Sequence, residues 1–348
     1  MVEKTYLYNE IVEQPQSVRR FLDEGLAPVR ELASAIRARG IDHVVIAARG
    51  TSDNAGRYAK YVLGAFNQLQ VSLATPSLFT IYQRPVHFGN ALVLGISQSG
   101  QSPDIVAILA EARRQGKLTA AITNTPNSPL AQQADYVIDL LAGVENAVAA
   151  TKTYTGSLAA IAALSAHLAP DGDQLLELQT LPEMMSNTLQ VEKEIEPLAQ
   201  RYRYMERCVV IGRGFNYATA FELALKLKEL TYAVVEPYSS ADFLHGPFAM
   251  LERGFPVIVL APQGALSTEM GQLVEQIQAR GAEVLAISDE AHITTQASLH
   301  IRLPQTVAEW LSPLTAIMPG QMLAMFLAAT QGNDVDAPRG IHKVTETT

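Results

Sequence analysis

Two long stretches of this chain repeat one pattern at a nearly constant spacing. Gly50 and Gly214 each follow an arginine and a short apolar run, and they are 164 positions apart. The segment 93–100 recurs at the same spacing, and Gly116 matches Gly281 at a spacing of 165. A register this constant predicts two copies of one domain. Because short apolar runs alternate with helical patterns, each copy is expected to be an α/β domain, a parallel sheet covered by helices on both faces.

The length of the chain agrees with two domains, because 348 residues exceed what one typical hydrophobic core organises. One helix is expected to start at Glu-Gln-Pro (13–15), and another is expected to run from Asn54 to about Phe66. For the charged end of the chain, order and disorder are both left open. The predicted organisation is an N-terminal helical segment (1–22), a first domain (23–185), a second domain (195–333) and a C-terminal tail (334–348).

The composition argues against several classes of protein. A net charge of −9 disfavours a nucleic-acid binder, since the phosphate backbone attracts an excess of Lys and Arg. The one cysteine, Cys208, excludes an internal disulfide and a multi-cysteine zinc site. No run is expected to reach the roughly twenty apolar residues of a membrane span, and the N-terminus lacks the apolar core of a signal peptide. We therefore expect a cytoplasmic protein that contacts neither membrane nor nucleic acid.

A polar turn follows the apolar run that ends at Ile96. Residues 97–102, Ser-Gln-Ser-Gly-Gln-Ser, carry five hydroxyl or amide side chains in six positions and precede a helical pattern over 104–115. Such a strand-to-helix turn presents N–H groups and hydroxyls to an anion such as phosphate. The turn has neither the Gly-Lys-Ser/Thr of a Walker loop nor GxGxxG, so a nucleotide is not favoured. The alternative is an ordinary serine cap. Since the second copy has Ala-Pro-Gln-Gly at 261–264, only the first copy is expected to hold the anion.

Ionisable residues gather in the second copy between Glu222 and His245. Glu222, Lys226 and Glu229 are spaced by four and three residues, so they share one face of a helix. The alternative is a solvated ion pair on an exposed face, but leucines between the charged positions favour partial burial. His245 precedes Gly246-Pro247, which is typical of a tight turn that fixes a side chain. The alternative for this histidine is a purely structural hydrogen bond in a loop.

These segments resemble the sugar isomerase (SIS) domain family, and most closely the isomerase half of glucosamine-6-phosphate synthase. Each motif is modest by itself, but six in the same order are specific, and with residues 13–15 they cover essentially the whole chain. The motifs are Arg-Gly-Thr-Ser (49–52), Ser-Gln-Ser-Gly-Gln-Ser (97–102), Ala-Ala-Thr-Lys (149–152), the helical run 222–229, His-Gly-Pro (245–247) and Asp-Val-Asp-Ala-Pro-Arg (334–339), with Lys343 beyond.

The resemblance implies two flavodoxin-like SIS domains and a homodimer that binds a hexose 6-phosphate, mainly in the first domain. In the family the histidine of the His-Gly-Pro motif reaches the site of the neighbouring subunit, so the active site would be shared. No metal cluster or nucleotide signature is present in the sequence, and no cofactor is expected. By motif match, the phosphate would be bound by Ser52, Ser97, Gln98, Ser99 and Ser102, and the sugar would lie along Thr51, Glu145 and Val148.

The same match assigns four catalytic roles. Glu229 would move a proton between C1 and C2, with Lys226 assisting nearby, and His245 would open the sugar ring. Lys343 would form an imine with the open-chain ketose. The chemistry agrees, because proton transfer between adjacent carbons needs one base of moderate pKa, which a partly buried carboxylate supplies. An imine-forming lysine must become neutral, which requires burial or a neighbouring cation; a tail that closes over the substrate would provide that burial.

The sequence departs from the synthase in two places. Val2 stands near the start of the chain, where the synthase has a glutaminase domain that begins with a nucleophilic cysteine, so we expect no glutamine-dependent synthesis from this chain alone. Leu244 replaces a basic residue before the motif histidine. The first hypothesis is interconversion of an aminohexose 6-phosphate and a ketohexose 6-phosphate with release of ammonia. The alternatives are an aldose–ketose isomerase, a fructosamine-phosphate deglycase and, outside enzymes, a phosphosugar-binding regulator.

Overall fold

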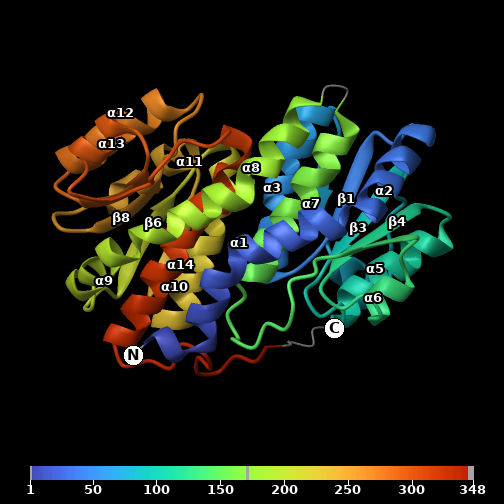
Figure 1. Ribbon diagram of the computed structural model, residues 1–348, viewed down its shortest axis with the longest axis horizontal. Helices are drawn as coiled ribbons and strands as arrows, with labels where there is room; N and C mark the ends of the chain where they lie inside the picture. The colour runs from blue at the N-terminus through green and yellow to red at the C-terminus, as the bar shows by residue number, and fades with distance from the viewer. Residues whose placement is uncertain (1, 170–171, 344–348) are drawn as a thin grey trace. The chain divides into compact units, whose positions relative to one another are not determined.

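Figure 1 shows the computed structural model of the chain, which describes residues 2–169 and 172–343. Parts of three predicted segments lie outside the described residues: Met1 of the helical segment, residues 170–171 of the first domain and residues 344–348 of the tail. The described chain forms two compact units. The first unit comprises Glu13–Glu145, Ala150–Thr180 and, of the tail, residues 342–343; the second unit comprises residues 2–12, Asn146–Ala149 and Leu181–Ile341.

The first unit is built on a five-stranded parallel sheet with the strand order β2-β1-β3-β4-β5. Every residue of β3 and β4 is buried, which is why these strands show no alternation with charged residues. The strands are β1 (His43–Ala47), β2 (Gln70–Leu73), β3 (Ala91–Ile96), β4 (Leu118–Thr123) and β5 (Tyr136–Asp139). One face is covered by α2 (Leu26–Ala38), α3 (Gly50–Asn67) and α7 (Lys152–Leu168), and the other by α5 (Pro103–Arg114) and α6 (Pro129–Gln132).

The second unit repeats this plan with the strand order β10-β9-β8-β6-β7, again all parallel. The strands are β6 (Arg207–Ile211), β7 (Val234–Tyr238), β8 (Pro256–Leu260), β9 (Glu283–Ser288) and β10 (Leu299–Arg302). Helices α9 (Glu192–Arg201), α10 (Tyr217–Thr231) and α14 (Ser312–Thr330) pack together on one face, and α12 (Ser267–Ala279) and α13 (Ala291–Gln296) on the other. The remaining elements are α1 (Tyr6–Glu24), α4 (Ser77–Thr80), α8 (Asp173–Thr188), α11 (Ser240–Leu244) and the 3-10 turns η1 (Val2–Lys4), η2 (Leu189–Val191), η3 (Gly214–Asn216), η4 (Pro247–Met250) and η5 (Glu309–Leu311).

The two units have the same topology. Numbered from its own first strand, each sheet has the order 2-1-3-4-5, which is the order of flavodoxin. The predicted fold class is therefore confirmed. A side-chain contact repeats as well: Arg49 forms an ion pair with Asp104 in the first unit, and Arg213 forms one with Glu269 in the second. The internal repeat thus extends from the strand order to an individual ion pair.

Helix α1 differs from the expectation that a helix starts at residues 13–15. It runs from Tyr6 to Glu24 with Pro15 inside it. A proline in a helix interior costs about 3 kcal/mol. Leu7, Ile11 and Phe21 are each at most 1% exposed, and burying each such side chain contributes about 2 kcal/mol. The apolar face of α1 therefore outweighs the proline, and the prediction of a helix start was wrong.

The last helical segment, Glu309–Thr330, corrects a second expectation. By length and composition this segment is apolar enough to cross a membrane, whereas the sequence analysis expected no such run. Its apolar window is entirely buried within the protein. A helix that is apolar on all sides suits a position inside a helix layer, where α14 packs against α9 and α10. The segment has the burial of a core helix.

Candidate functional site

The polar turn between β3 and α5 forms a cradle of hydroxyls and N–H groups. The Ser97 hydroxyl accepts a hydrogen bond from the Gly100 N–H (3.1 Å), and the Ser99 hydroxyl accepts one from Gln101 (3.3 Å). Ser102 occupies the cap position of α5, but its hydroxyl accepts no hydrogen bond from the first turn of that helix. The alternative of an ordinary serine cap therefore does not describe Ser102.

Glycine is required at the centre of this turn. Gly100 has a φ of +62°, a conformation that residues with a side chain rarely adopt. A Cβ atom there would lie 2.0 Å from the Ser128 hydroxyl oxygen. The carbonyl of Gly100 accepts the N–H of Leu130 (3.0 Å), and that of Gln98 accepts the N–H of Asn124 (3.1 Å). The turn is thus fixed against α6 and the end of β4.

The second side of the cradle is the start of α3. This helix begins at Gly50, four residues earlier than predicted, because Gly50 adopts a φ of +53° and turns the chain directly from β1 into the helix. Thr51 and Ser52 consequently lie in the first helical turn, and both are half-buried. Strands β1 and β3 are parallel neighbours, so the N-termini of α3 and α5 meet at one edge of the sheet. Helix N-termini favour bound anions.

Arg49 and Asp104 connect the two sides of the cradle. The Arg49 guanidinium donates to one Asp104 oxygen from Nε (2.9 Å) and Nη2 (2.8 Å), and the Asp104 side chain is completely buried. The other oxygen accepts the N–H of Ile105 (2.9 Å). The sequence analysis missed this pair, although its repetition by Arg213 and Glu269 at the matching positions was a signal. The Arg49 charge is thus paired with Asp104, and the hydroxyls and N–H groups of the two turns are further donors that this edge offers to an anion.

The equivalent turn of the second unit is filled by the protein itself. The N–H of Ala265 donates to a Glu309 carboxylate oxygen (3.0 Å), and the N–H of Gln263 donates to Asp289 (2.7 Å). A Cβ atom on Gly264 would lie 2.2 Å from the Glu309 carboxyl carbon. Side-chain carboxylates therefore occupy the place where a bound anion would sit. This arrangement supports the expectation that only the first copy holds phosphate.

Glu145 is a buried carboxylate with several hydrogen-bond donors around it. Its Oε1 accepts the N–H groups of Thr151 (3.0 Å) and Thr153 (3.1 Å), and its Oε2 accepts the Thr153 hydroxyl (2.8 Å). Lys343 from the tail reaches the same oxygen with its Nζ (2.7 Å). Burial by itself raises the pKa of Glu145, but the ion pair with Lys343 and these hydrogen bonds outweigh it and hold the pKa below its ordinary value.

A cavity of about 520 Å³ brings together two residues of the predicted site, Gln98 and Glu145. Asn124 contributes to its wall, and its side chain also fixes the backbone by accepting from Ala142 (3.0 Å) and donating to Gly143 (2.7 Å). Sequence reasoning did not identify Asn124. The cavity lies beyond the carboxyl ends of β3, β4 and β5, and it is lined by Arg20, Gln98, Asn124, Thr125, Asp139, Leu141, Gly143, Val144 and Glu145.

Three charged residues of α10, Glu222, Lys226 and Glu229, form a largely buried cluster. The Glu222 side chain is 0% exposed and that of Lys226 is 1% exposed, whereas Glu229 retains 23% exposure. The Lys226 Nζ lies 2.5 Å from Glu229 Oε2 and 3.5 Å from Glu222 Oε1. The alternative of a solvated ion pair on an exposed face is therefore wrong. One lysine between two carboxylates, one of them open to solvent, has the composition of a proton-transfer site.

His245 and Val148 lie on two further segments of the second unit. His245 follows α11, is exposed, and precedes Gly246, which has a φ of +134°. Within the described part of the chain its imidazole makes no hydrogen bond or ion pair. The alternative, a histidine held by a structural hydrogen bond, is therefore not supported by the described residues. Leu244 beside it is 46% exposed. Val148 is half-buried, and its N–H donates to the carbonyl of Asp336 in the tail (3.0 Å).

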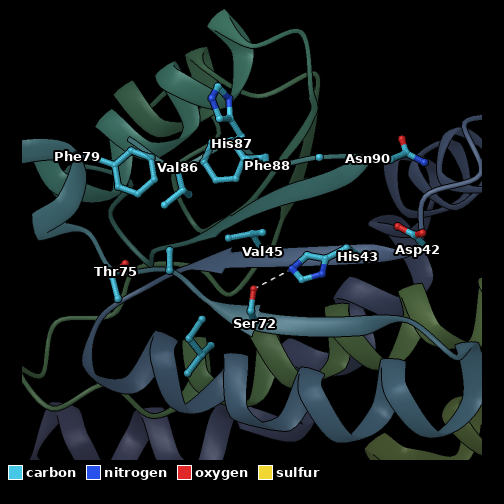
Figure 2. A pocket seen from close by; sticks show the side chains of 13 residues that line it. Asp42, His43, Val45, Ser72, Thr75, Phe79, Val86, His87, Phe88 and Asn90 are labelled. Atoms are coloured by element: carbon cyan, nitrogen blue, oxygen red, sulfur yellow. Dashed lines mark hydrogen bonds between the residues drawn. The ribbon is translucent and has the colours of Figure 1, made fainter. Parts of the chain in front are cut away.

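A separate cavity of about 420 Å³ contains none of the predicted site residues (Figure 2). It lies over β1 and β2 and is closed by residues of the segment 74–90. The ring of His43 is hydrogen-bonded to the Ser72 hydroxyl (2.9 Å), as the dashed line in Figure 2 marks. Among the residues that the structure describes, no group of three or more His, Cys, Asp and Glu side chains is arranged to hold a metal ion.

Comparison with family models matches two segments of the chain, 39–166 and 202–331, to the SIS domain. Among curated proteins, a relative is the glutamine–fructose-6-phosphate aminotransferase (isomerizing) of Zymomonas mobilis, which is 35% identical over 363 aligned residues. The match covers 99% of this chain and 60% of the aminotransferase. The chain thus spans less than two thirds of that relative's length.

Two solved structures are similar to the whole chain. The C-terminal domain of glucosamine-fructose-6-phosphate aminotransferase from Francisella tularensis has a TM-score of 0.88 and 29% identity, covering 96% of this chain and 98% of that one. A protein of Silicibacter pomeroyi that is provisionally assigned as a phosphosugar isomerase has a TM-score of 0.86 and 35% identity. That match covers 95% of this chain and 100% of the other.

Replacing Gly100 by alanine is expected to destabilise the protein through two separate effects. The left-handed backbone costs about 1 kcal/mol for a residue with a Cβ, and the clash with Ser128 adds about 2 kcal/mol. Gly116→Ala is the matched control, because Gly116 has a φ of +68° with nothing within 4 Å of an added Cβ. Urea unfolding should show the larger loss for Gly100→Ala, and equal losses would contradict the clash.

Replacing Lys343 by methionine should change how the stability depends on pH through Glu145. The lowered pKa of Glu145 means that its carboxylate stabilises the fold above the unfolded pKa of about 4.3, and that this contribution disappears as the pH falls through the lower folded pKa. Without the lysine the carboxylate is buried unpaired, which should cost about 2 kcal/mol at pH 7. The difference from wild type should shrink as the pH falls, because the Glu145 pKa in the variant is raised by burial and its carboxylate is protonated before that of the wild type.

The control for this experiment is Lys343→Met in a Glu145→Gln background. There the lysine has no carboxylate partner at position 145, so its removal should change the free energy of unfolding by much less. A difference between Lys343→Met and wild type that stays constant between pH 7 and pH 3 would contradict the ion pair.

Proposed function

The chain belongs to the SIS domain family, and on that premise we propose that it is a phosphosugar-converting enzyme. Its reaction is the interconversion of an aminohexose 6-phosphate, such as glucosamine 6-phosphate, and a ketohexose 6-phosphate, with ammonia released in the favoured direction. The observation that carries the proposal is the buried Glu222–Lys226–Glu229 cluster. A regulator needs a phosphate site but no base, whereas burial of two carboxylates around one lysine is costly and suits proton transfer.

The substrate phosphate is assigned to the cradle of the first unit. The donors are the hydroxyls of Ser52, Ser99 and Ser102 and the N-termini of α3 and α5. In the second unit, by contrast, the Glu309 carboxylate accepts an N–H group of the equivalent turn. Ser97 shapes the turn by accepting the Gly100 N–H. Gln98 is assigned to the phosphate as well, and the sugar is assigned to Thr51, Glu145 and Val148. This division makes the first copy the binding domain and the second copy the source of the base.

The proposed chemistry begins with ring opening by His245. Glu229, which is partly open to solvent, then takes the proton from C2 of the open-chain aldose and delivers to C1 a proton that has exchanged with water. The amine passes a proton to O1 in the same step, which leaves an imine at C2. The Lys343 ammonium, which lies beside Glu145, passes a proton to the imine nitrogen, and its amine then adds to C2. A proton moves from the lysine nitrogen to the departing amine, so that ammonia leaves and a lysine imine remains. Water hydrolyses the resulting lysine imine, which regenerates Lys343 and releases the ketohexose 6-phosphate. The Lys226 ammonium balances the negative charge that Glu229 carries before it takes the proton.

A plain aldose–ketose isomerase is the second candidate. The relative from Silicibacter pomeroyi supports it, because that protein is provisionally assigned as a phosphosugar isomerase at 35% identity. The same base would move a proton between C1 and C2 of a neutral sugar through an enediol, and no imine would be needed. Lys343 would then keep its ion pair with Glu145 throughout the cycle. The two candidates therefore differ in their need for the lysine.

The proposal includes a homodimer in the cytoplasm, in which His245 of each subunit acts in the active site of the other subunit. The exposure of His245, and the absence of a partner for its ring among the described residues, support an imidazole that is available to another subunit. Leu244 beside it is an exposed apolar side chain, which is suited to an interface.

Glucosamine 6-phosphate should yield ammonia and fructose 6-phosphate with the wild type. Glu229→Gln should lower kcat at least about a hundredfold, because a general base is removed. Lys343→Ala should abolish ammonia release, and Lys228→Ala, an exposed neighbour on α10, is the matched control. Fructose 6-phosphate converted to glucose 6-phosphate without any ammonia would identify the isomerase. Binding without either reaction would identify the regulator.

Mixing two inactive variants tests the shared site. If His245 acts across the dimer, a heterodimer of His245→Ala and Glu229→Gln chains contains one site with both residues intact. Co-refolded mixtures should then recover about a quarter of the wild-type activity, since half of the dimers carry one working site of two. Mixtures as inactive as their components would place both residues in the same subunit's site.

A further inference from the structure

One residue of the tail, Asp336, is hydrogen-bonded to two distant segments of the second unit. Its carboxylate accepts the N–H groups of Tyr6 (3.0 Å) and Leu7 (2.8 Å) at the start of α1. Its carbonyl accepts the N–H of Val148 (3.0 Å). The first-turn N–H groups of a helix have no partner within the helix, so a carboxylate from elsewhere in the chain satisfies them and complements the helix dipole. Asp336 therefore fixes the tail to α1 and to the loop 146–149 at once.

The loop 146–149 is held from a second direction by Glu10 on α1. The Glu10 side chain is 4% exposed and accepts the N–H groups of Asn146 and Ala147. Together with Asp336, it accounts for the N–H groups of three successive residues, 146–148. The loop backbone is thus specified by two carboxyl-bearing residues, one from each end of the chain. Neither was recognised in the sequence as part of a site.

The tail has further anchors around Asp336. Asp334 accepts the N–H groups of Asp336 (2.9 Å) and Ala337 (3.1 Å), which closes a tight turn. The Arg339 N–H donates to the Tyr232 hydroxyl (2.9 Å), and its guanidinium lies 4.0 Å from the centre of that ring. Tyr232 directly follows α10, the helix of Glu229. The segment 334–339 is therefore fixed on the second unit over its whole length.

We propose that Asp336 is a positioning residue for the imine-forming step, an inference that rests on the proposed function. Lys343 follows it by seven residues, a tether that extends to at most about 25 Å. The Asp336 carbonyl accepts the Val148 N–H, and the Lys343 amine pairs with Glu145, which precedes Val148 by three positions in the sequence. Fixing the base of the tether keeps the amine at a high effective concentration when it leaves Glu145 for the substrate.

The test compares Asp336→Ala and Asp336→Asn with Thr5→Ala. Thr5 caps the same helix by accepting the N–H of Tyr8 (3.2 Å), so its loss weakens α1 without touching the tail. Each protein is incubated with fructose 6-phosphate and borohydride, and the reduced lysine adduct is measured by mass. For each protein, the hydrogen exchange of the 146–149 amides and the kcat and KM for glucosamine 6-phosphate are measured as well.

Asp336→Ala is expected to lower adduct formation and kcat at least about tenfold while KM changes little, because the phosphate cradle is untouched. Its 146–149 amides should exchange faster. Asp336→Asn, which keeps one acceptor, should lie between it and wild type, and Thr5→Ala should form the adduct normally. Equal adduct formation by Asp336→Ala and wild type would overturn the inference. A wild type that forms no adduct would overturn the proposed lysine chemistry instead, and unchanged exchange in Asp336→Ala would separately refute the anchor.

Discussion

The carboxyl edge of a parallel sheet is the constraint on which this protein depends. In the order 2-1-3-4-5 the chain leaves β1 and β3 in the same direction, toward helices on opposite faces, and the polar turns after these two strands become neighbours. The Arg49–Asp104 pair connects the two turns. Gly50 and Gly100 adopt the left-handed backbone conformation at the two places where the chain passes from a strand into a helix. Hydroxyls and N–H groups then meet at one place beside this ion pair.

The two copies of the fold differ at a few positions in the turn after the third strand and in the helix after the first strand. In the first copy the turn after the third strand keeps its hydroxyls, whereas in the second copy Glu309 and Asp289 occupy the corresponding N–H groups. The second copy instead carries a lysine between two carboxylates on the helix after its first strand, at positions that are apolar or aromatic in the first copy. The polar turn and the buried charged cluster can thus be altered independently, since each is carried by a different copy.

The sequence predicted what depends on local pattern. Apolar runs indicated most of the strands, although β7 and β10 were not identified. The repeat predicted two copies of one fold, and the polar turn 97–102 was recognised from its residues. What it did not predict depends on tertiary contacts. Helix α1 continues through Pro15 because its apolar face is buried, and α3 starts early because Gly50 takes the turn. The carboxylates of Glu10, Asp336 and Glu309 bind N–H groups of residues 44 or more positions away in the sequence, and no short motif announces such contacts.

The central claim is that Glu229 moves a proton between C1 and C2 of a bound phosphosugar. The most direct measurement is deuterium incorporation, by proton NMR, into glucosamine 6-phosphate and fructose 6-phosphate incubated with the protein in heavy water. The account predicts deuterium at C1 or C2 with the wild type and none with Glu229→Gln, whichever product accumulates. A wild type that binds these phosphosugars but leaves their C1 and C2 hydrogens unexchanged would contradict it.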